Sequence, residues 1–434
     1  MDSRFNVMDA DFIRDPYPTY RRLQEEAPVY WHEPTGYWWL TRHDDVWNAL
    51  RDPMFRSGRV DALLGNVPDA QQEPKRILRE LLEPRLLLTD GPRHARLRSL
   101  IGQAFAPREI ERMRPVVRAT IQEQLETLRN RSRIEVMSEL ADPLPSRMIC
   151  RIIGLPSERF DEFKAWTNDI YAFLGLASGS RGDQAAVAAR SGQAVAEFLE
   201  KEIAVRRRRP SDDLLSTLIQ AEEVGGRLTH PEIIANVVGL LNAGHETTTN
   251  LLGNGLFLLL QHPHIMHELR SDPDRIGAVI EEMARLESPV QILGRRLDER
   301  LLLHDVELPV GSNVLLLTGA ANRDPWAFDD PDRFDIFRAG SRSVSFGYGP
   351  HFCIGAALAR VIAEEFFRSL LAEWTSLSLI GPIHWRPYPI FRGLSSMTVE
   401  VERRQTPGMA ILAEPIEELR LRVLQELTDT TELN

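Results

Sequence analysis

The sequence predicts a mainly α-helical protein with small β-sheets. Apolar residues recur every three or four positions over most of the chain, whereas strand-like runs are short and scattered. The chain has 434 residues, of which 43% are hydrophobic, so it can bury a large core. We find no internal repeat and no Gly/Ser-rich linker that would divide it. We therefore expect one large domain over residues 1–403.

The helical periodicity is clearest in four segments, and short runs rich in β-branched and aromatic residues mark the strands. The four helical segments are 18–26, 94–105, 109–128 and 192–209. The strand-like runs are "YWWLTR" at 37–42, "NVLLLTG" at 313–319 and "MTVEVE" at 397–402. The mixed composition of 60–90 and the Gly/Ser content of 175–183 predict mobile surface loops. These strands are too few for a doubly wound sheet.

The longest predicted helix starts near residue 229. Thr229 and Glu232 have the spacing of a capping box, and the apolar pattern continues to Leu260. No lysine or arginine occurs between Arg227 and Arg270, a pattern that resembles a membrane span. The segment nevertheless contains too many polar side chains for lipid: Asn236, Asn242, His245, Glu246, three threonines, Asn250 and Asn254. We expect a helix through the centre of the protein.

The middle of this helix reads "AGHET". Gly244 removes a side chain, and Glu246 and Thr247 place an acid beside an alcohol in apolar surroundings. Such groups are costly to bury unless they are paired or used. Taken alone, a glycine packing contact beside a threonine that bonds back to its own helix is the commoner explanation.

The bulk properties exclude several classes of partner. A net charge of -11 disfavours nucleic acid and anionic lipid as partners. The first residues include acids and arginines and no apolar signal region, so we expect a cytoplasmic protein without a membrane anchor. The two cysteines, Cys150 and Cys353, form no Cys-x-x-Cys pair, which argues against a disulfide framework and a structural zinc site.

Cys353 lies in an unusual loop, "FGYGPHFCIG", that leads into a predicted helix. Backbone N–H groups and the positive end of that helix favour a thiolate. Gly347 and Gly349 permit backbone conformations that other residues resist, and Gly355 allows a flat, bulky group to approach the chain. We interpret Cys150 as a buried, inert core residue. A thiolate at a helix start beside glycines is what an axial ligand of haem iron requires.

On these residues the chain resembles the cytochrome P-450 family of haem-thiolate monooxygenases. The signature Phe-Gly-x-Gly-x-His-x-Cys-x-Gly is matched at Phe346, Gly347, Gly349, His351, Cys353 and Gly355. "EEMAR" supplies the family's Glu-x-x-Arg at Glu282 and Arg285, and "PDRF" supplies Arg333, which the resemblance implies joins them in a buried network. The expected fold is therefore the cytochrome P-450 fold, with the long central helix over haem.

The resemblance also implies a site. Cys353 would ligate the iron of haem b, and Glu246 and Thr247 would manage protons for bound O₂. The expected haem contacts are His94, Arg98, Ala243, Gly244, Arg295, Phe346, Gly347, His351, Cys353 and Gly355. The region of Gly244 would leave room for O₂. From the residues alone, a surface pair four positions apart would be the preferred explanation of His94 and Arg98.

The implied function is the insertion of one oxygen atom of O₂ into a lipophilic small molecule, such as a terpenoid, polyketide, steroid or fatty acyl chain. No flavin or iron–sulfur segment is present, so a separate ferredoxin-type partner would supply electrons. Its docking patch is predicted at Arg96, Arg108, Arg342 and Arg360. The alternatives are a peroxide-driven peroxygenase and a non-catalytic haem-binding sensor. Both are disfavoured by the intact acid and alcohol.

The substrate pocket is predicted to be mostly apolar. By resemblance it would draw on the 60–90 segment, Trp166 to Leu174, Leu240, Ala243, Val290 to Leu293 and the turn near Leu394. Three arginines near the first segment could instead meet a substrate carboxylate: Arg56, Arg59 and Arg85.

Two segments depart from the family pattern. The stretch "LHDVELPVGSNV" has His304 and Asp305 where a glycine is usual, so the hairpin there could differ. Residues 404–434 form a C-terminal extension that we predict to be a helix, packed on the domain or frayed, with Ile416, Leu419, Val423 and Leu427 on one face.

Overall fold

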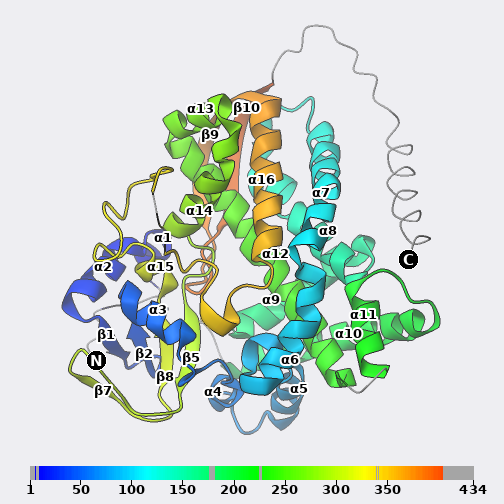
Figure 1. Cartoon of the computed structure of the whole chain (residues 1–434), viewed down its shortest axis with the longest axis vertical. Coiled ribbons are helices and arrows are strands. Elements are labelled where there is room, and N and C mark those ends of the chain that lie inside the picture. Colours follow the sequence, from blue (N-terminus) through cyan, green and yellow to red (C-terminus); the bar gives the residue numbers. More distant parts are fainter. Residues whose placement is uncertain are drawn as a thin grey trace. The chain divides into compact units, whose positions relative to one another are not determined.

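A computed structural model describes residues 5, 9–174, 181–223, 227–338, 340 and 342–403 (Figure 1). The chain up to residue 402 forms one compact unit. Its architecture is mainly α-helical with small sheets, as predicted. The helix predicted for 404–434 lies outside the described residues.

Helices provide most of the structure. They are α1 (Ala10–Arg14), α2 (Tyr17–Glu26), α3 (His43–Arg51), α4 (Val60–Gly65), α5 (Gln72–Leu82), α6 (Gly91–Ile101), α7 (Pro107–Thr127), α8 (Pro143–Ile153), α9 (Phe160–Leu174), α10 (Arg181–Arg208), α11 (Leu214–Glu223), α12 (His230–Gln261), α13 (Pro263–Ser271), α14 (Ile276–Leu286), α15 (Thr318–Ala321) and α16 (Ala356–Glu373). The four helical segments predicted from periodicity correspond to α2, α6 with the following turn, α7 and the second half of α10.

The strands form three separate sheets within the described ranges. They are β1 (Val29–His32), β2 (Tyr37–Leu40), β3 (Phe55–Arg56), β4 (Arg133–Glu135), β5 (Leu293–Leu297), β6 (Leu301–Leu303), β7 (Val306–Leu308), β8 (Asn313–Leu316), β9 (Trp374–Trp385) and β10 (Leu394–Arg403). The largest sheet has the order β1-β2-β8-β5-β3, in which only β2 and β8 run parallel. The other sheets are β4-β10-β9 and the β6-β7 hairpin. All three predicted strands are present.

The long central helix is confirmed as α12. Thr229 caps it, and its backbone N–H donates to Glu232 Oε2 over 3.1 Å, completing the predicted capping box. Most of the helix is buried, including its asparagines. Asn236 donates to the carbonyl of Pro84 and accepts from the backbone N–H of Leu86, so a buried amide ties α12 to the segment before α6. No helix in the described ranges is long and apolar enough to cross a membrane.

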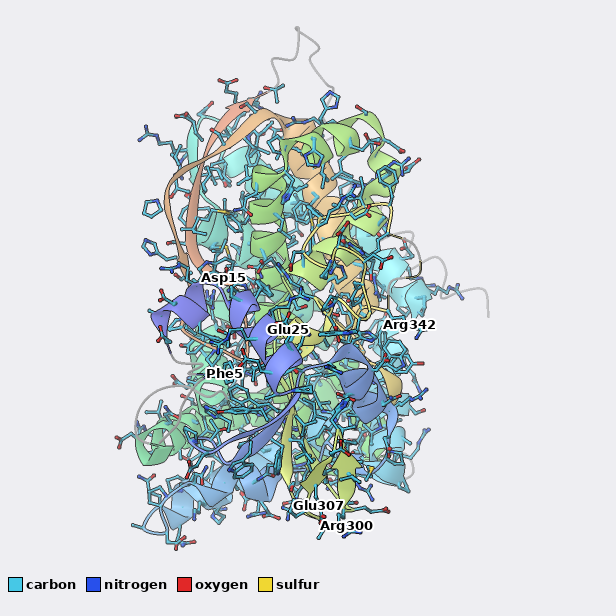
Figure 2. All side chains as sticks on the ribbon, turned by 90° about the vertical axis from the view of Figure 1, so that its left-hand side faces the viewer. Phe5, Asp15, Glu25, Arg300, Glu307 and Arg342 are labelled. Carbon is cyan, nitrogen blue, oxygen red and sulfur yellow. The ribbon has the colours of Figure 1, made fainter. Side chains whose placement is uncertain are left out.

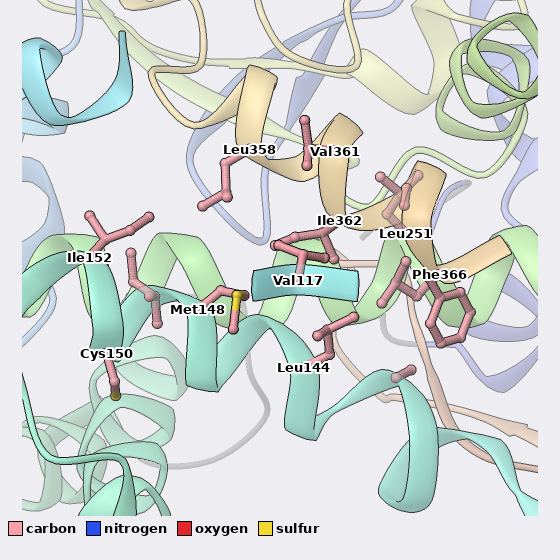
Figure 3. Packing of buried hydrophobic residues seen from close by; sticks show 14 of the residues in the cluster. Val117, Leu144, Met148, Cys150, Ile152, Leu251, Leu358, Val361, Ile362 and Phe366 are labelled. Carbon is pink, nitrogen blue, oxygen red and sulfur yellow. The ribbon is translucent and has the colours of Figure 1, made fainter. Parts of the chain in front are cut away.

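The main core forms where α7, α8, α12 and α16 meet. Figure 3 shows Val117 of α7, Leu144 and Met148 of α8, Leu251 of α12 and Phe366 of α16 converging in this core. Cys150 is fully buried in the same cluster, and burial raises the pKa of its thiol to about 12. Cys150 is therefore an inert core residue, as predicted.

Two local predictions are corrected by the structure. The 60–90 segment is not a loop, because α4 and α5 occupy much of it and bury Leu64, Leu78 and Leu82. Of the second predicted loop, residues 175–180 lie outside the described ranges, and residues 181–183 begin α10.

The β6-β7 hairpin forms without the usual glycine. Its turn consists of His304 and Asp305, which adopt φ angles of 48° and 61°. Two residues with positive φ are what a tight hairpin turn needs, and aspartate tolerates that region better than most residues. His304 also contacts Asp45 of α3 at 2.8 Å, a contact that fixes the turn against the body of the protein.

Candidate active site

Cys353 sits in a tightly folded loop three residues before α16. The Cys353 backbone N–H donates to the Phe346 carbonyl over 2.8 Å, which closes the loop. Gly347 and Gly349 have φ angles of 70° and 72°, where side chains are disfavoured. A Cβ on Gly349 would also lie 2.8 Å from the Leu50 carbonyl oxygen. The predicted need for glycine at these two positions is confirmed.

Opposing effects act on the ionisation of the Cys353 thiol. The residue keeps an exposed surface, but surrounding protein atoms desolvate the sulfur and raise the pKa of the thiol above its usual value. The Gly355 N–H and the charges of Arg360 and Arg98 lower that pKa only in part. The predicted contribution of a backbone N–H group is therefore present at Gly355, and burial opposes it. A metal ion that binds the sulfur would deprotonate it.

Next to this loop, α6 and β5 contribute a group of cationic and imidazole side chains. The rings of His94 and His351 lie 4.1 Å apart between centroids. Arg98 donates to the Phe352 carbonyl over 2.8 Å, which ties α6 to the cysteine loop. Arg295 is buried, and burial together with the charge of Arg59 lowers its pKa to about 10. The structure thus brings together four of the predicted haem contacts: His94, Arg98, Arg295 and His351.

Arg59 joins this group, although the sequence suggested a role for it toward substrate. Burial lowers the pKa of its guanidinium, and a Cβ on Gly294 would lie 2.4 Å from Arg59 Nε, so the side chain lies against β5. Sequence reasoning missed this position because only the fold brings residue 59 next to Arg295. The one available signal in the sequence is Gly294, because a glycine within a strand often marks a position where another group packs closely against the backbone.

Asp90 is the carboxylate that organises this cluster. It accepts from the backbone N–H groups of Ser57 and Gly58 over 3.1 and 2.7 Å. It also contacts His351 Nε2 at 3.4 Å. Burial opposes its ionisation, but the hydrogen bonds from His351, Gly58 and Ser57 outweigh burial and hold the pKa of Asp90 well below its ordinary value. One side chain therefore links the Arg59 segment, the start of α6 and the cysteine loop.

The cluster has more cationic groups than carboxylates to neutralise them. Arg59, Arg295 and Arg98 donate to backbone carbonyls and, within the described part of the chain, form no ion pair. The buried Nε2 of His94 has no hydrogen-bond partner in the part of the chain that the structure describes. Burial, His351 and Arg98 lower the pKa of His94 to about 4, so this ring is neutral at pH 7.

These features fit the two carboxylates of a haem group. Arginine suits carboxylates because its N–H groups match both oxygens, and buried cations need such partners. A Cβ built on Gly355 would meet no atom within 4 Å, so open space lies beside the backbone next to Cys353. The donor set, a single thiol beside unneutralised arginines, therefore agrees with a haem-thiolate site.

In the middle of α12, Glu246 and Thr247 lie in different environments, because Glu246 is buried and Thr247 is half-buried. Ala243 is exposed and Thr247 half-buried, although most of the helix is buried. The Thr247 hydroxyl donates to the Ala243 carbonyl over 2.8 Å, the back-bonded form considered above. A Cβ on Gly244 would lie 2.9 Å from Ile149 of α8. The absent side chain at Gly244 therefore admits Ile149, and the space for O₂ expected in this region stays a prediction.

Glu246 is buried on another side of the helix. Burial raises the pKa of its carboxyl, and the charge of Arg386 lowers that pKa in part. The distance between Arg386 Nη1 and Glu246 Oε1 is 3.4 Å. Its sequence neighbour His245 contacts Asp142 at 2.8 Å, and Lys164 pairs with that same carboxylate.

The Glu-x-x-Arg network is confirmed with one correction. Glu282 receives two hydrogen bonds from Arg285, at 2.8 and 2.7 Å, and Arg285 is fully buried. The predicted third member, Arg333, has an exposed side chain and contributes only its carbonyl to Arg285. The side chain that reaches Glu282 is Arg338, at 3.1 Å. The direction of the loop around residue 335 decides which arginine points inward.

The predicted docking patch is partly neutralised. Arg96 pairs with Glu232 at 2.7 Å and Arg360 with Glu281 at 2.5 Å. Arg108 and Arg342 form no ion pair within the described residues, and Figure 2 shows Arg342 at the outer surface. Arg360 also lies 4.4 Å from the ring centre of Phe346, so it supports the cysteine loop from the side of α16.

The predicted pocket residues have different environments. Leu240 and Leu394 are buried, whereas Val290 and Leu293 are half-buried. Of the arginines considered for a substrate carboxylate, Arg56 pairs with Asp298 at 2.5 Å near the surface. Arg85 is buried and donates to the Leu81 carbonyl over 3.0 Å.

Comparison with known proteins gives consistent results. The family model described as Cytochrome P450 matches residues 75–378. Cytochrome P450 107B1 of Saccharopolyspora erythraea is 38% identical over 402 residues, which cover 91% of this chain and 96% of that protein. The polyketide biosynthesis cytochrome P450 PksS of Bacillus subtilis is 33% identical, over 92% of this chain and 99% of that protein.

The fold also matches solved structures. The crystal structure of P450BioI, in complex with an acyl carrier protein that carries hexadec-9Z-enoic acid, superposes with a TM-score of 0.84 at 32% identity. The match covers 91% of this chain and 100% of the P450BioI chain.

Proposed function

The chain belongs to the cytochrome P450 family of monooxygenases, and we propose that it inserts one oxygen atom of O₂ into a lipophilic small molecule. The observation that carries this proposal is the Cys353 loop beside a cluster of arginines that, among the described residues, form no ion pair. Residues 1–403 would form the catalytic domain.

The proposed cofactor is haem b. Cys353 would hold the iron, while His94, Arg98, Arg295 and His351 would hold its carboxylates, with Arg59 as an additional contact. When bound, haem-thiolate iron supplies the activation of O₂. The protein's own contribution is to bind and orient the reactants, to exclude water and to supply protons.

Glu246 and Thr247 are the proposed proton-handling residues. Because burial raises the pKa of Glu246, its carboxyl retains a proton at higher pH than an exposed glutamate does. Such a group is suited to general acid–base catalysis near neutral pH. The Thr247 oxygen, whose proton is directed to the Ala243 carbonyl, keeps lone pairs that can accept a hydrogen bond.

An acyl or polyketide chain is the substrate class we favour. The names of two similar proteins refer to polyketide biosynthesis and to an acyl carrier protein with a long unsaturated acid. Leu240 and Leu394, which we predicted to line the pocket, are apolar and could contact such a chain. Electrons would come from a separate ferredoxin, for which Arg108 and Arg342 are the remaining candidates in the predicted patch.

The test is NADH consumption by the purified holoprotein with a ferredoxin, its reductase and a panel of lipophilic substrates, combined with mass spectrometry of the products. An oxygenated product that carries ¹⁸O from ¹⁸O₂ supports the proposal. Product formed only with added peroxide favours a peroxygenase. Absence of product under both conditions favours a haem-binding sensor.

A further inference from the structure

Glu246 has one ion-pair partner among the residues that the structure describes, and that partner comes from a distant sheet. Its side chain is 5% exposed and that of Arg386 is 18% exposed. The 3.4 Å separation of Arg386 Nη1 and Glu246 Oε1 is long for a charge-assisted hydrogen bond. The guanidinium is therefore close enough to influence the carboxylate but is not locked onto it.

Arg386 is anchored by its backbone instead. It follows β9 directly, and its N–H donates to the Gly393 carbonyl over 2.9 Å. Its side-chain Nε also donates to the Leu394 carbonyl over 3.3 Å. The turn that we predicted to line the substrate pocket therefore sets the position of the guanidinium beside Glu246.

A small cavity lies next to Arg386. Its lining includes Arg386, Trp385, Gln291 and Tyr20. Its volume, about 20 Å³ measured to water centres, is enough for about one water molecule. The buried hydroxyl of Tyr20 has no hydrogen-bond partner among the described residues, as is typical of a group that bonds to water. Arg386 therefore borders this cavity and also contacts Glu246, which is not among the lining residues.

We propose that Arg386 is a positioning residue for Glu246, which holds the Glu246 carboxylate in place and controls its exchange of protons. The inference rests on the proposed role of Glu246 in supplying protons for O₂ activation. Arg386 touches neither O₂ nor substrate in this account and acts only through Glu246.

The other charged groups around Glu246 support this assignment. His245 on α12 and Lys164 on α9 both contact Asp142 before α8, and each of the three influences Glu246 only through its charge. After burial, the charge of Arg386 has the largest effect on the pKa of Glu246, and it lowers that pKa. Removal of the guanidinium therefore favours the protonated acid.

The test compares Arg386→Met, Arg386→Lys and the control Arg133→Met. Arg133 lies on β4 of the same sheet, and its nearest carboxylate, Glu400, is 3.9 Å away. The first readout is an infrared titration of the resting protein. A difference spectrum against Glu246→Gln identifies the Glu246 carboxyl band. The second readout is the fraction of NADH recovered as product across pH.

The expected result is a Glu246 titration midpoint at higher pH in Arg386→Met, with Arg386→Lys between that variant and the parent and Arg133→Met unchanged. The alkaline limb of the product yield should move in the same direction. A midpoint in Arg386→Met or Arg386→Lys that equals the parent value overturns the inference. If the Glu246 midpoint shifts in the Arg386 variants but the protein forms no product from any substrate, Arg386 still positions Glu246. That outcome contradicts the proposed function and not the inference.

Discussion

Replacement of Arg285 by methionine should destabilise the protein far more than loss of a surface arginine. Arg285 is fully buried and donates to Glu282 and to the carbonyls of Asn322, Pro331 and Arg333. The variant would leave the Glu282 carboxylate buried with only part of its charge compensated. Removal of one partner from a buried ion pair typically costs about 3–5 kcal/mol.

For Arg285→Met we expect a loss of stability at the lower end of this range, because other donors still reach Glu282. Arg338 Nε still contacts Glu282 at 3.1 Å, and the Asp335 backbone N–H donates to it over 3.1 Å. We therefore expect Arg285→Met to reduce the free energy of unfolding by about 3 kcal/mol. Arg285→Lys should not restore the lost free energy of unfolding, because one ammonium group cannot replace the several N–H donors of a guanidinium.

The assay is urea unfolding of the holoprotein followed by circular dichroism. Arg129→Met is the matched control, because Arg129 and Glu126 form a helical pair in which both side chains are 60% exposed. Exposed pairs contribute at most about 1 kcal/mol. If Arg285→Met and the control lose equal stability, the reasoning about this buried network is wrong.

Three further outcomes follow from the site and its surroundings. Thr247→Val should lower the yield of product per NADH and raise peroxide release, which a peroxide assay measures. Asp90→Asn should speed haem transfer to apomyoglobin, because His351 and the Gly58 segment lose their shared carboxylate. Glu232→Gln should lower the free energy of unfolding at pH 7, which urea unfolding of the variant and the parent measures. Burial opposes ionisation there, but hydrogen bonds from Arg96 lower the pKa of Glu232 to about 2. Because the folded pKa is depressed, this stability is present above the unfolded value of about 4.3 and is lost as pH falls toward 2.

Much of the fold was predictable because its helices bury one regular face. The capping box at Thr229 and Glu232 located the start of α12 correctly. The prediction failed at α4 and α5, because a segment with several prolines and charged residues resembles a loop until tertiary packing buries Leu78 and Leu82. Strand β9 was missed because many of its side chains are exposed, and it lacks a buried face.

The site was predictable only where its chemistry is local in sequence. The Cys353 loop carries its own glycine pattern, and the structure confirms that pattern. Arg386 and Glu246 are 140 residues apart, so no spacing rule links them. Arg338, and not the predicted Arg333, contacts Glu282 because of the direction in which the loop between them turns. Both residues are arginines, so residue type alone does not show which of them points inward.

The most direct test of the account is the reduced, carbon-monoxide-bound difference spectrum of the purified protein and of Cys353→Ser. The account predicts a strongly red-shifted Soret band in the parent that disappears in the variant, because only a thiolate ligand produces it. A parent protein that is folded but shows no such band, or a variant that retains it, would contradict the assignment of Cys353 as the iron ligand.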